Sequence, residues 1–282
     1  MNINWYPGHM KKTKESIKKN LSLVDIVYEV IDARIPFSSR NPDMDEILGN
    51  KPRLIIMNKS DLADKAANRK WQAYFEEKGI SSVLVDSIKN KGLEDVVVLS
   101  YKLTEEKKKN LAKKGIKNRP IRAMIVGIPN VGKSTLINSL SKRKGTKVGN
   151  RPGVTKTTQW IRIKGDLELL DTPGILWPKF EDKEVGLNLA FTGAIKDELL
   201  DVENLAIKLV ERLNSISKTF IQERYSVLIE KKTSYDILLE IGEKRGCIIR
   251  GGEIDFDKAS YIVLDEFRKG VIGRITLELP IC

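Results

Sequence analysis

The sequence has one histidine, two cysteines and no long apolar run, and each scarcity excludes a class of protein. Cys247 and Cys282 cannot build a disulfide framework, and no Cys/His spacing is typical of a zinc site. No apolar stretch approaches the roughly 18 residues that a membrane helix needs. The N-terminal residues lack the continuous apolar core of a signal peptide. We therefore expect a cytoplasmic protein in a reducing compartment.

Acidic residues are scarce in three particular stretches of a chain whose net charge is +12. Residues 1–20 carry a net charge of +4, residues 102–122 carry +7, and residues 141–165 hold eight basic residues and no acidic one. Residues 179–282 instead carry −3. Any single lysine run can be a solvated helix face, but three clusters favour a polyanionic partner, because binding to phosphates needs clustered cations.

Short apolar runs, each followed by a polar residue or, at Gly127, by a glycine, predict the strands of a parallel sheet. Helical periodicity between the runs, as over residues 63–78, predicts an α/β fold with its sites at the carboxyl ends of the strands. Residues 159–164 are expected to form a hairpin with the last run. The expected buried strands are residues 26–31, 54–57, 83–85, 123–126 and 167–170.

The pattern changes after residue 178. We predict a first domain over residues 1–178 and a small all-helical domain over residues 179–282. The first domain includes a basic N-terminal segment, 1–22, and a charged stretch, 102–119, that is expected to be an exposed helical connector. In the second domain, helical periodicity covers residues 184–194, 202–216, 234–242 and 257–269.

A phosphate-binding loop is the sharpest motif in the chain. Residues 127–134 have the pattern G-x(4)-G-K-S between an expected strand and an expected helix, which is the context such a loop requires. Backbone N–H groups are expected to surround the β-phosphate, Lys133 to bridge the β- and γ-phosphates, and the Ser134 hydroxyl to bind Mg²⁺. The residues expected to contact the nucleotide here are Asn130, Val131, Gly132, Lys133, Ser134 and Thr135.

Two further motifs are expected to complete the phosphate site. Asp171-Thr-Pro-Gly174 follows an expected strand, so that Asp171 can hold Mg²⁺ and the Gly174 N–H can sense the γ-phosphate. Alone, a D-x-x-G pattern is weak, and its place after a phosphate loop gives it weight. Between the two motifs a Pro-Gly turn precedes Thr155, the expected Mg²⁺-binding threonine, with Thr157 as an alternative.

Asn58-Lys59-Ser60-Asp61 follows another expected strand and indicates guanine as the base. The Asp61 carboxylate can accept hydrogen bonds from both N1–H and N2–H₂ of guanine, while Lys59 packs along the base. Adenine presents the opposite pattern, so this carboxylate selects GTP over ATP. Ser87 and Ile88 can supply backbone contacts to the guanine oxygen, although isoleucine stands where alanine is usual.

The guanine-reading elements precede the phosphate loop, which reverses the order found in ordinary GTPases. With Trp5-Tyr-Pro-Gly-His-Met10 and Asp32-Ala-Arg-Ile-Pro36, this order resembles the circularly permuted GTPases of the bacterial ribosome biogenesis GTPase A (YlqF/RbgA) group. The resemblance covers essentially the whole chain. It implies a circularly permuted P-loop GTPase fold. It also implies a late assembly factor for the large (50S) subunit, acting on 23S rRNA and ribosomal proteins, with GTP hydrolysis driving its release.

The resemblance also implies substitutes for a missing water-positioning group. Many GTPases place glutamine directly after D-x-x-G, where this chain has Ile175, which cannot hydrogen-bond to water. Asn130 matches relatives that bind K⁺ beside the phosphates, and His9 is implied to reach the site on the bound subunit. A slow intrinsic GTPase stimulated by the ribosome is therefore expected. Two alternatives stay open: another class of NTPase that shares only the phosphate loop, and a non-catalytic RNA-binding scaffold with a structural nucleotide.

Overall fold

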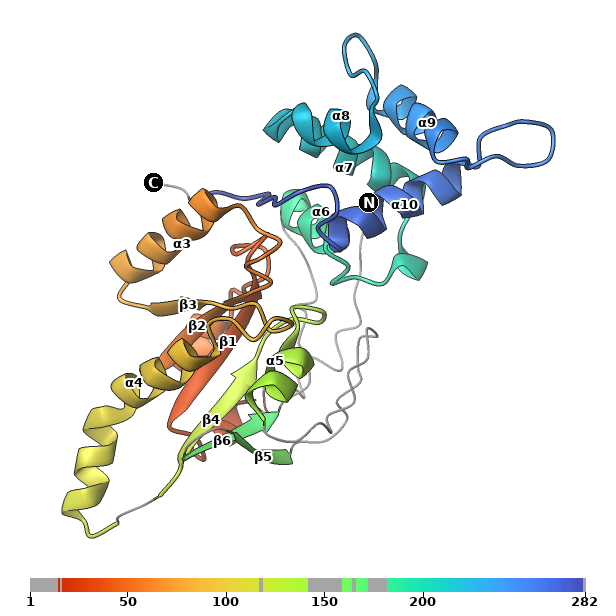
Figure 1. Ribbon diagram of the computed structural model, residues 1–282. Coiled ribbons are helices and arrows are strands. Elements are labelled where there is room, and N and C mark those ends of the chain that lie inside the picture. Colours follow the sequence, from red (N-terminus) through yellow and green to blue (C-terminus); the bar gives the residue numbers. More distant parts are fainter. Residues whose placement is uncertain are drawn as a thin grey trace.

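The computed structural model of the chain describes residues 15, 17–116, 119–141, 159–163, 166–171 and 182–280. A six-stranded sheet flanked by helices carries a group of further helices at one end (Figure 1). The strands are β1 Ile26–Asp32, β2 Arg53–Asn58, β3 Ser81–Leu84, β4 Ile121–Val126, β5 Gln159–Ile163 and β6 Leu167–Asp171. The helices are α2 Met44–Leu48, α3 Lys65–Glu77, α4 Leu93–Lys113, α5 Lys133–Leu140, α6 Lys183–Phe191, α7 Val202–Ile216, α8 Thr219–Tyr225, α9 Ser234–Lys244 and α10 Phe256–Arg268, with a 3₁₀ turn, η1, at Asp197–Leu199.

The sheet has the strand order β3-β2-β1-β4-β6-β5, and all neighbours are parallel except β5 and β6. The predicted hairpin is confirmed, since Gln159 pairs with Asp171 and Ile163 with Leu167 in an antiparallel register. β1 is buried along its whole length, which explains its nearly unbroken apolar character. The predicted α/β fold is thereby confirmed.

Successive residues of β2 pack on opposite faces of the sheet, as the pleat of a strand requires. Ile55 belongs to a hydrophobic cluster with Trp71 and Phe75 of α3. Its neighbour Ile56 belongs to the main core, together with Val96 of α4. The aromatic residues of the helix predicted over residues 63–78 are therefore core residues, and they fix α3 beside the loop that follows β2.

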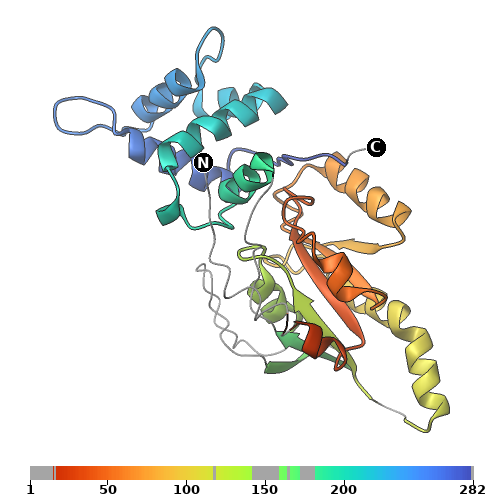
Figure 2. The ribbon, with the colours of Figure 1, turned by 180° about the vertical axis from the view of Figure 1, so that it is seen from behind.

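Helix α4 begins well before the stretch of residues 102–119 that was expected to be a connector. Its first half packs on the sheet: Ser100 is buried, and its Oγ lies 2.6 Å from the Tyr28 hydroxyl. Consecutive valines in this half hide the helical period from a reading of the sequence. The second half carries exposed lysines and extends beyond the sheet (Figure 2).

Helices α6, α7, α9 and α10 coincide closely with the helical segments expected after residue 178. In α7 the buried residues recur with the period of a helix that packs one face on its neighbours; they are Val202, Leu205, Ala206, Leu209, Val210 and Leu213. The short helices α2 and α8 were not predicted, because a helix of two turns or fewer shows no period. None of the helices in the described part of the chain is long and apolar enough to cross a bilayer.

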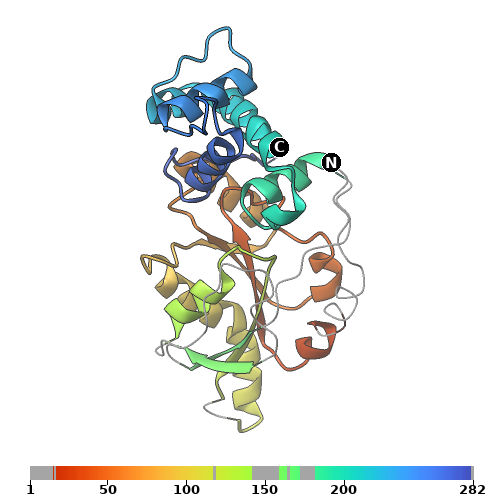
Figure 3. The same cartoon turned by 90° about the vertical axis from the view of Figure 1, so that its right-hand side faces the viewer.

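The segment after α10 returns to the α/β part of the chain, above which the C-terminal helices are stacked (Figure 3). The amide of Ile275 donates to the carbonyl of Leu62 at 2.9 Å, and that of Leu277 to the carbonyl of Arg34 at 2.8 Å. The indole Nε1 of Trp71 donates to the carbonyl of Glu278 at 3.1 Å. Residues 275–278 therefore bind the two parts together. The expected domain boundary near residue 178 lies outside the described residues and stays a prediction.

Candidate nucleotide-binding site

The phosphate loop expected from the sequence connects β4 to α5, at the edge of the sheet where the parallel strands end (Figure 1). Two of its glycines lie where a side chain has no room. At Gly132, φ is +95°, and an added Cβ would lie 2.3 Å from Nδ2 of Asn58. At Gly127, an added Cβ would lie 2.4 Å from the carbonyl oxygen of Val30. The loop is glycine-rich here because the ends of β1 and β2 approach its backbone closely.

Replacing Gly132 with alanine is expected to lower the affinity for GDP by about tenfold, because the new Cβ displaces the Asn58 amide from the loop and one hydrogen bond is lost. Titration with a fluorescent GDP analogue measures the change. Gly251→Ala is the matched control, since Gly251 also has a positive φ, +108°, with nothing within 4 Å of an added Cβ. Equal affinities in the two variants would contradict the role given to the Asn58 contact.

Asn58 joins residues 58–61, the expected guanine-reading motif, to the phosphate loop. Its Nδ2 donates to the carbonyl of Val131 at 2.7 Å, and its Oδ1 accepts from the Ser87 hydroxyl at 2.7 Å. The carbonyl of Ser87 in turn accepts from the hydroxyl of Ser139 on α5, at 2.6 Å. Three segments that are far apart in the sequence are therefore fixed against one another at one edge of the sheet.

Lys59 lies between the phosphate loop and the end of β1. Its Nζ donates to the carbonyl of Asn130 at 2.6 Å and to Oδ2 of Asp32 at 2.9 Å. Burial alone raises the pKa of the Asp32 carboxyl, but the neighbouring Arg34 and Lys59 outweigh burial and hold this pKa far below its usual range. Asp32 is therefore a permanent buried anion beside the lysine that is expected to pack along the base.

Asp61, the expected base-reading carboxylate, is partly exposed. Among the described residues it forms no side-chain hydrogen bond or ion pair, so both of its oxygens can accept donors from a ligand. The backbone amide of Ile88, expected near the guanine oxygen, instead donates to Oδ1 of Asp86 at 3.1 Å, and the Ile88 side chain is 81% exposed. A contact from the Ile88 amide to guanine would have to replace or share this internal hydrogen bond.

Lys133 has its ammonium inside the phosphate loop. Its Nζ donates to the carbonyls of Gly127 and Ile128, at 2.9 and 2.7 Å. The side chain is nearly buried, and α5 begins at this residue, with Ser134 and Thr135 in the first turn. Free N–H groups of a first helical turn and a lysine ammonium together favour a bound anion.

The strand register brings Asp171 beside the phosphate loop. Asp171 is the last residue of β6 and pairs with Ile125, which precedes Gly127 on β4. A carboxylate at this position and the Ser134 hydroxyl are hard oxygen donors of the kind that Mg²⁺ prefers. The residues present at this edge of the sheet therefore fit a magnesium-bound phosphate group.

Asn130 has a positive φ of 61° and directs its side-chain amide toward the C-terminal helices. Its Nδ2 donates to the carbonyl of Gly193, just after α6. Among the described residues no donor reaches its Oδ1. The residue that the family resemblance links to K⁺ thus belongs to the phosphate loop and contacts the helical part.

Several expected site residues lie outside the described residues: His9, Thr155, Thr157 and Gly174. Conversely, the structure adds Asp32, which the sequence analysis did not include in the site. Its place at the end of a buried strand, beside the strand that ends in Asn58, is the signal that could have identified it.

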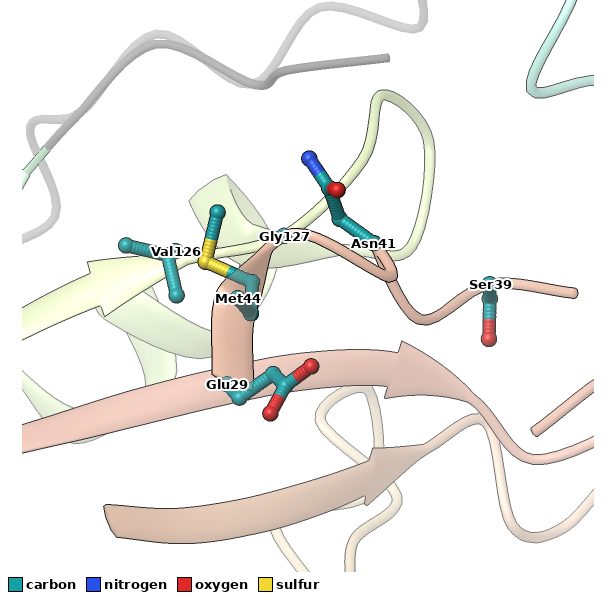
Figure 4. A pocket seen from close by; sticks show the side chains of 6 residues that line it. All are labelled: Glu29, Ser39, Asn41, Met44, Val126 and Gly127. Atoms are coloured by element: carbon teal, nitrogen blue, oxygen red, sulfur yellow. The ribbon is translucent and has the colours of Figure 1, made fainter. Parts of the chain in front are cut away.

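A small cavity lies on the other side of Gly127 (Figure 4). Its volume is about 10 Å³, no more than one water molecule needs. The buried Nδ2 of Asn41 has no hydrogen-bond partner among the described residues, and such a water could supply one. The cavity is far too small for a nucleotide and belongs to the packing behind the loop. Its lining residues are Glu29, Ser39, Asn41, Met44, Val126 and Gly127.

Comparison with known proteins agrees with this geometry. Residues 122–237 match the sequence profile described as "50S ribosome-binding GTPase". Two solved structures share the fold. The GDP-bound structure of TM YlqF has a TM-score of 0.67 and 26% identity, covering 94% of this chain and 99% of that one. The GNP-bound YlqF from T. maritima has a TM-score of 0.65 and 26% identity, covering 95% and 98%.

A curated bacterial relative is similar over nearly the whole length of both chains. Ribosome biogenesis GTPase A of Bacillus cereus is 46% identical over 280 residues, which cover 99% of this chain and 95% of the relative. The reversed order of the guanine-reading and phosphate-binding motifs lies within that alignment. The chain therefore belongs to the ribosome biogenesis GTPase A family.

Proposed function

We propose that the protein is a cytoplasmic GTPase that binds the large (50S) ribosomal subunit during its assembly and hydrolyses GTP to GDP and phosphate. The observation that carries the proposal is the hydrogen bond of 2.7 Å from Asn58 to the carbonyl of Val131, which joins a guanine-reading motif to a phosphate loop. A phosphate loop alone serves many nucleotides, whereas the attached motif selects one base. The names of the relatives supply the ribosomal partner.

The base is proposed to be read by Asp61 and supported by Lys59. The Asp61 carboxylate has no side-chain partner among the described residues and is therefore available to N1–H and N2–H₂ of guanine. Lys59 is held in one position by Asp32 and by the carbonyl of Asn130, at 2.9 and 2.6 Å. A lysine fixed in this way offers its alkyl chain as a rigid surface for the base at little further cost in side-chain entropy.

The phosphates are proposed to lie against residues 127–134, with Lys133 exchanging its two loop carbonyls for phosphate oxygens. Ser134, Asp171 and Thr155 are the proposed ligands of Mg²⁺, which when bound neutralises charge on the phosphate oxygens. The backbone N–H of Gly174 is proposed to sense the γ-phosphate. Holding the phosphate chain in a fixed position is the larger part of catalysis for this reaction.

The attacking water needs a group that Ile175 cannot provide. We assign this role to His9 on the ribosome-bound protein, and we assign a K⁺ ion to Oδ1 of Asn130, which has no donor among the described residues. Both assignments come from the family resemblance. They imply a slow GTPase in isolation that becomes fast on its ribosomal partner.

The second half of α4 and the edge strand β5 are proposed to face RNA. Nζ of Lys108 lies 4.9 Å from the ring centre of Tyr101, and Arg122 lies 4.9 Å from that of Trp160, which is 40% exposed. Arg162, on the same strand as Trp160, is 87% exposed. Arg122 is half-buried and, like Arg162, pairs with Glu168, at 3.3 and 3.6 Å. Cations beside aromatic rings suit a partner that presents both phosphates and bases. The helical part and the segment around Thr155, residues 151–158, are proposed to complete the contact with the subunit.

Co-sedimentation of the full chain with purified large subunits, with phosphate release measured in parallel, tests the proposed function. We expect tighter binding with a non-hydrolysable GTP analogue than with GDP, and turnover that rises when subunits are added. A His9→Ala variant is expected to keep binding and to lose about 100-fold of the stimulated rate, as for removal of a positioned acid–base group. Stimulation equal to wild type in this variant would remove His9 from the mechanism.

The same experiment separates the alternatives. A non-catalytic scaffold would bind subunits without releasing phosphate at any subunit concentration. Another class of NTPase would bind ADP as tightly as GDP and would not sediment with subunits. Equal affinity for subunits with GDP and with the GTP analogue would contradict a nucleotide switch.

A further inference from the structure

Arg34 follows β1, and its buried guanidinium joins two parts of the chain. It pairs with Asp32 through two hydrogen bonds, from Nε to Oδ1 at 2.9 Å and from Nη2 to Oδ2 at 2.7 Å. Its Nη1 donates to the carbonyls of Phe267 and Arg268, at 3.4 and 3.2 Å, where α10 ends. One side chain therefore connects the end of β1 to the C-terminal helices, which lie over this edge of the sheet (Figure 1).

Asp32 connects Arg34 to the nucleotide site. Its Oδ2 accepts from Nη2 of Arg34 at 2.7 Å and from Nζ of Lys59 at 2.9 Å. Arg34 and Asp32 are only 1% and 2% exposed, so loss of the Asp32 charge leaves Arg34 without a carboxylate in the interior, and loss of Arg34 leaves Asp32 with Lys59 alone, and both losses are costly. The position of Lys59, and through it that of the Asn130 carbonyl at 2.6 Å, therefore depends on Arg34.

A second set of contacts leads from the end of α10 to the phosphate loop. Nε of Arg268 donates to the carbonyl of Phe191 at 3.0 Å, and Asp197 binds the Arg268 guanidinium with both oxygens at 2.7 Å. Just after Phe191, the carbonyl of Gly193 accepts from the side chain of Asn130. The contacts, with the short backbone from Phe191 to Gly193, close into a ring, which we name the Arg34 ring: Arg34, Asp32, Lys59, Asn130, Gly193, Phe191 and Arg268.

We propose that Arg34 is a positioning residue for guanine-nucleotide binding. We further propose that, through the Arg34 ring, nucleotide affinity and the position of α6 and α10 against the α/β part depend on each other. This inference rests on the proposed function, because it concerns the same nucleotide. A ligand that fixes Lys59 and Asn130 favours the arrangement in which Gly193 and Arg268 are in contact with the α/β part. By linkage, the factor by which the bound nucleotide favours that arrangement equals the factor by which that arrangement raises the affinity for the nucleotide.

Two variants break the ring at different points. Arg268→Gln removes contacts at the α6–α10 junction, where the side chain is partly exposed and distant in sequence from either nucleotide-binding loop. Arg34→Lys keeps a positive charge but cannot make the paired hydrogen bonds to Asp32. We expect each variant to weaken binding of a fluorescent GDP analogue about fivefold or more, the lower end of ordinary coupling between sites. We expect the double variant to lose less than the product of the two effects.

Arg224→Gln is the matched control. Arg224 binds Glu266 of α10 with two hydrogen bonds, at 2.8 and 2.6 Å, and therefore also supports the C-terminal helices, but it lies outside the ring. This variant is expected to lower the melting temperature and to leave GDP affinity unchanged. A loss of affinity in Arg268→Gln alone thus cannot be a general result of loosening the helices.

Amide hydrogen exchange distinguishes coupling through Arg34 from a merely structural role of this residue, because only coupling makes protection by GDP depend on Arg34. In the wild type, saturating GDP is expected to slow exchange in residues 189–194 and 267–270. In Arg34→Lys, saturating GDP is expected to leave the exchange rates of these segments unchanged. GDP affinities of Arg268→Gln and Arg34→Lys within twofold of the wild type, or protection by GDP that persists in Arg34→Lys, would overturn the inference. Failure of the wild type to bind GDP would instead overturn the proposed function.

Discussion

Replacing Asp61 with asparagine is expected to change the preferred base from guanine to xanthine. The Asp61 carboxylate is proposed to accept both N1–H and N2–H₂ of guanine, and asparagine offers one acceptor and one donor. Its donor would face the guanine N2–H₂, so two charge-assisted hydrogen bonds are lost and GDP affinity falls by about 10²- to 10⁴-fold. Xanthine keeps N1–H but carries a carbonyl at C2, which accepts from the new amide.

Competition binding with GDP and xanthosine diphosphate measures this change of preferred base. Asp95→Asn is the matched control, because it makes the same change of charge at an exposed position in the first turn of α4. We expect the control to keep the wild-type preference for GDP. Retention of that preference in Asp61→Asn as well would show that another group reads the base.

Replacing Lys133 with alanine is expected to abolish productive binding of GTP. The Lys133 ammonium is nearly buried, and it donates hydrogen bonds to the carbonyls of Gly127 and Ile128. Removing it takes charge-assisted hydrogen bonds from the phosphates, and we expect affinity for GTP to fall by about 10²- to 10³-fold. Phosphate release should then stay at background even with large subunits present.

Isothermal titration with a non-hydrolysable GTP analogue checks the loss, and Lys65→Ala at the exposed start of α3 is the control for charge. A melting curve of Lys133→Ala separates loss of the loop itself from loss of the ligand contact. Unchanged affinity in a folded Lys133→Ala protein would contradict the placement of the phosphates in this loop.

The convergence of the candidate nucleotide-binding loops could be predicted, because each loop is a local pattern at the end of a parallel strand. Asn58 ends β2, Ser87 and Gly132 lie in the loops after β3 and β4, and the ends of neighbouring parallel strands lie at one edge of the sheet. Their convergence, including the hydrogen bond from Asn58 to Val131, therefore follows from topology as much as from motif.

The contacts of Arg34 could not be predicted in this way. Its partners at Phe267 and Arg268 are more than 200 residues away, and both are backbone carbonyls, which have no signature in the sequence. The hydrogen bond between Asn130 and Gly193 has the same character, since any residue in place of Gly193 would also present a carbonyl. The early start of α4 was missed for a different reason, because consecutive valines suit a strand as well as a helix.

The most direct test of the central claim is a crystal structure of the protein grown with GDP. We expect one nucleotide, with its guanine edge on Asp61 and its diphosphate in the loop around Lys133. A nucleotide that touches only one of these two residues, or a diphosphate held elsewhere, would contradict a single site assembled from both halves of the α/β part.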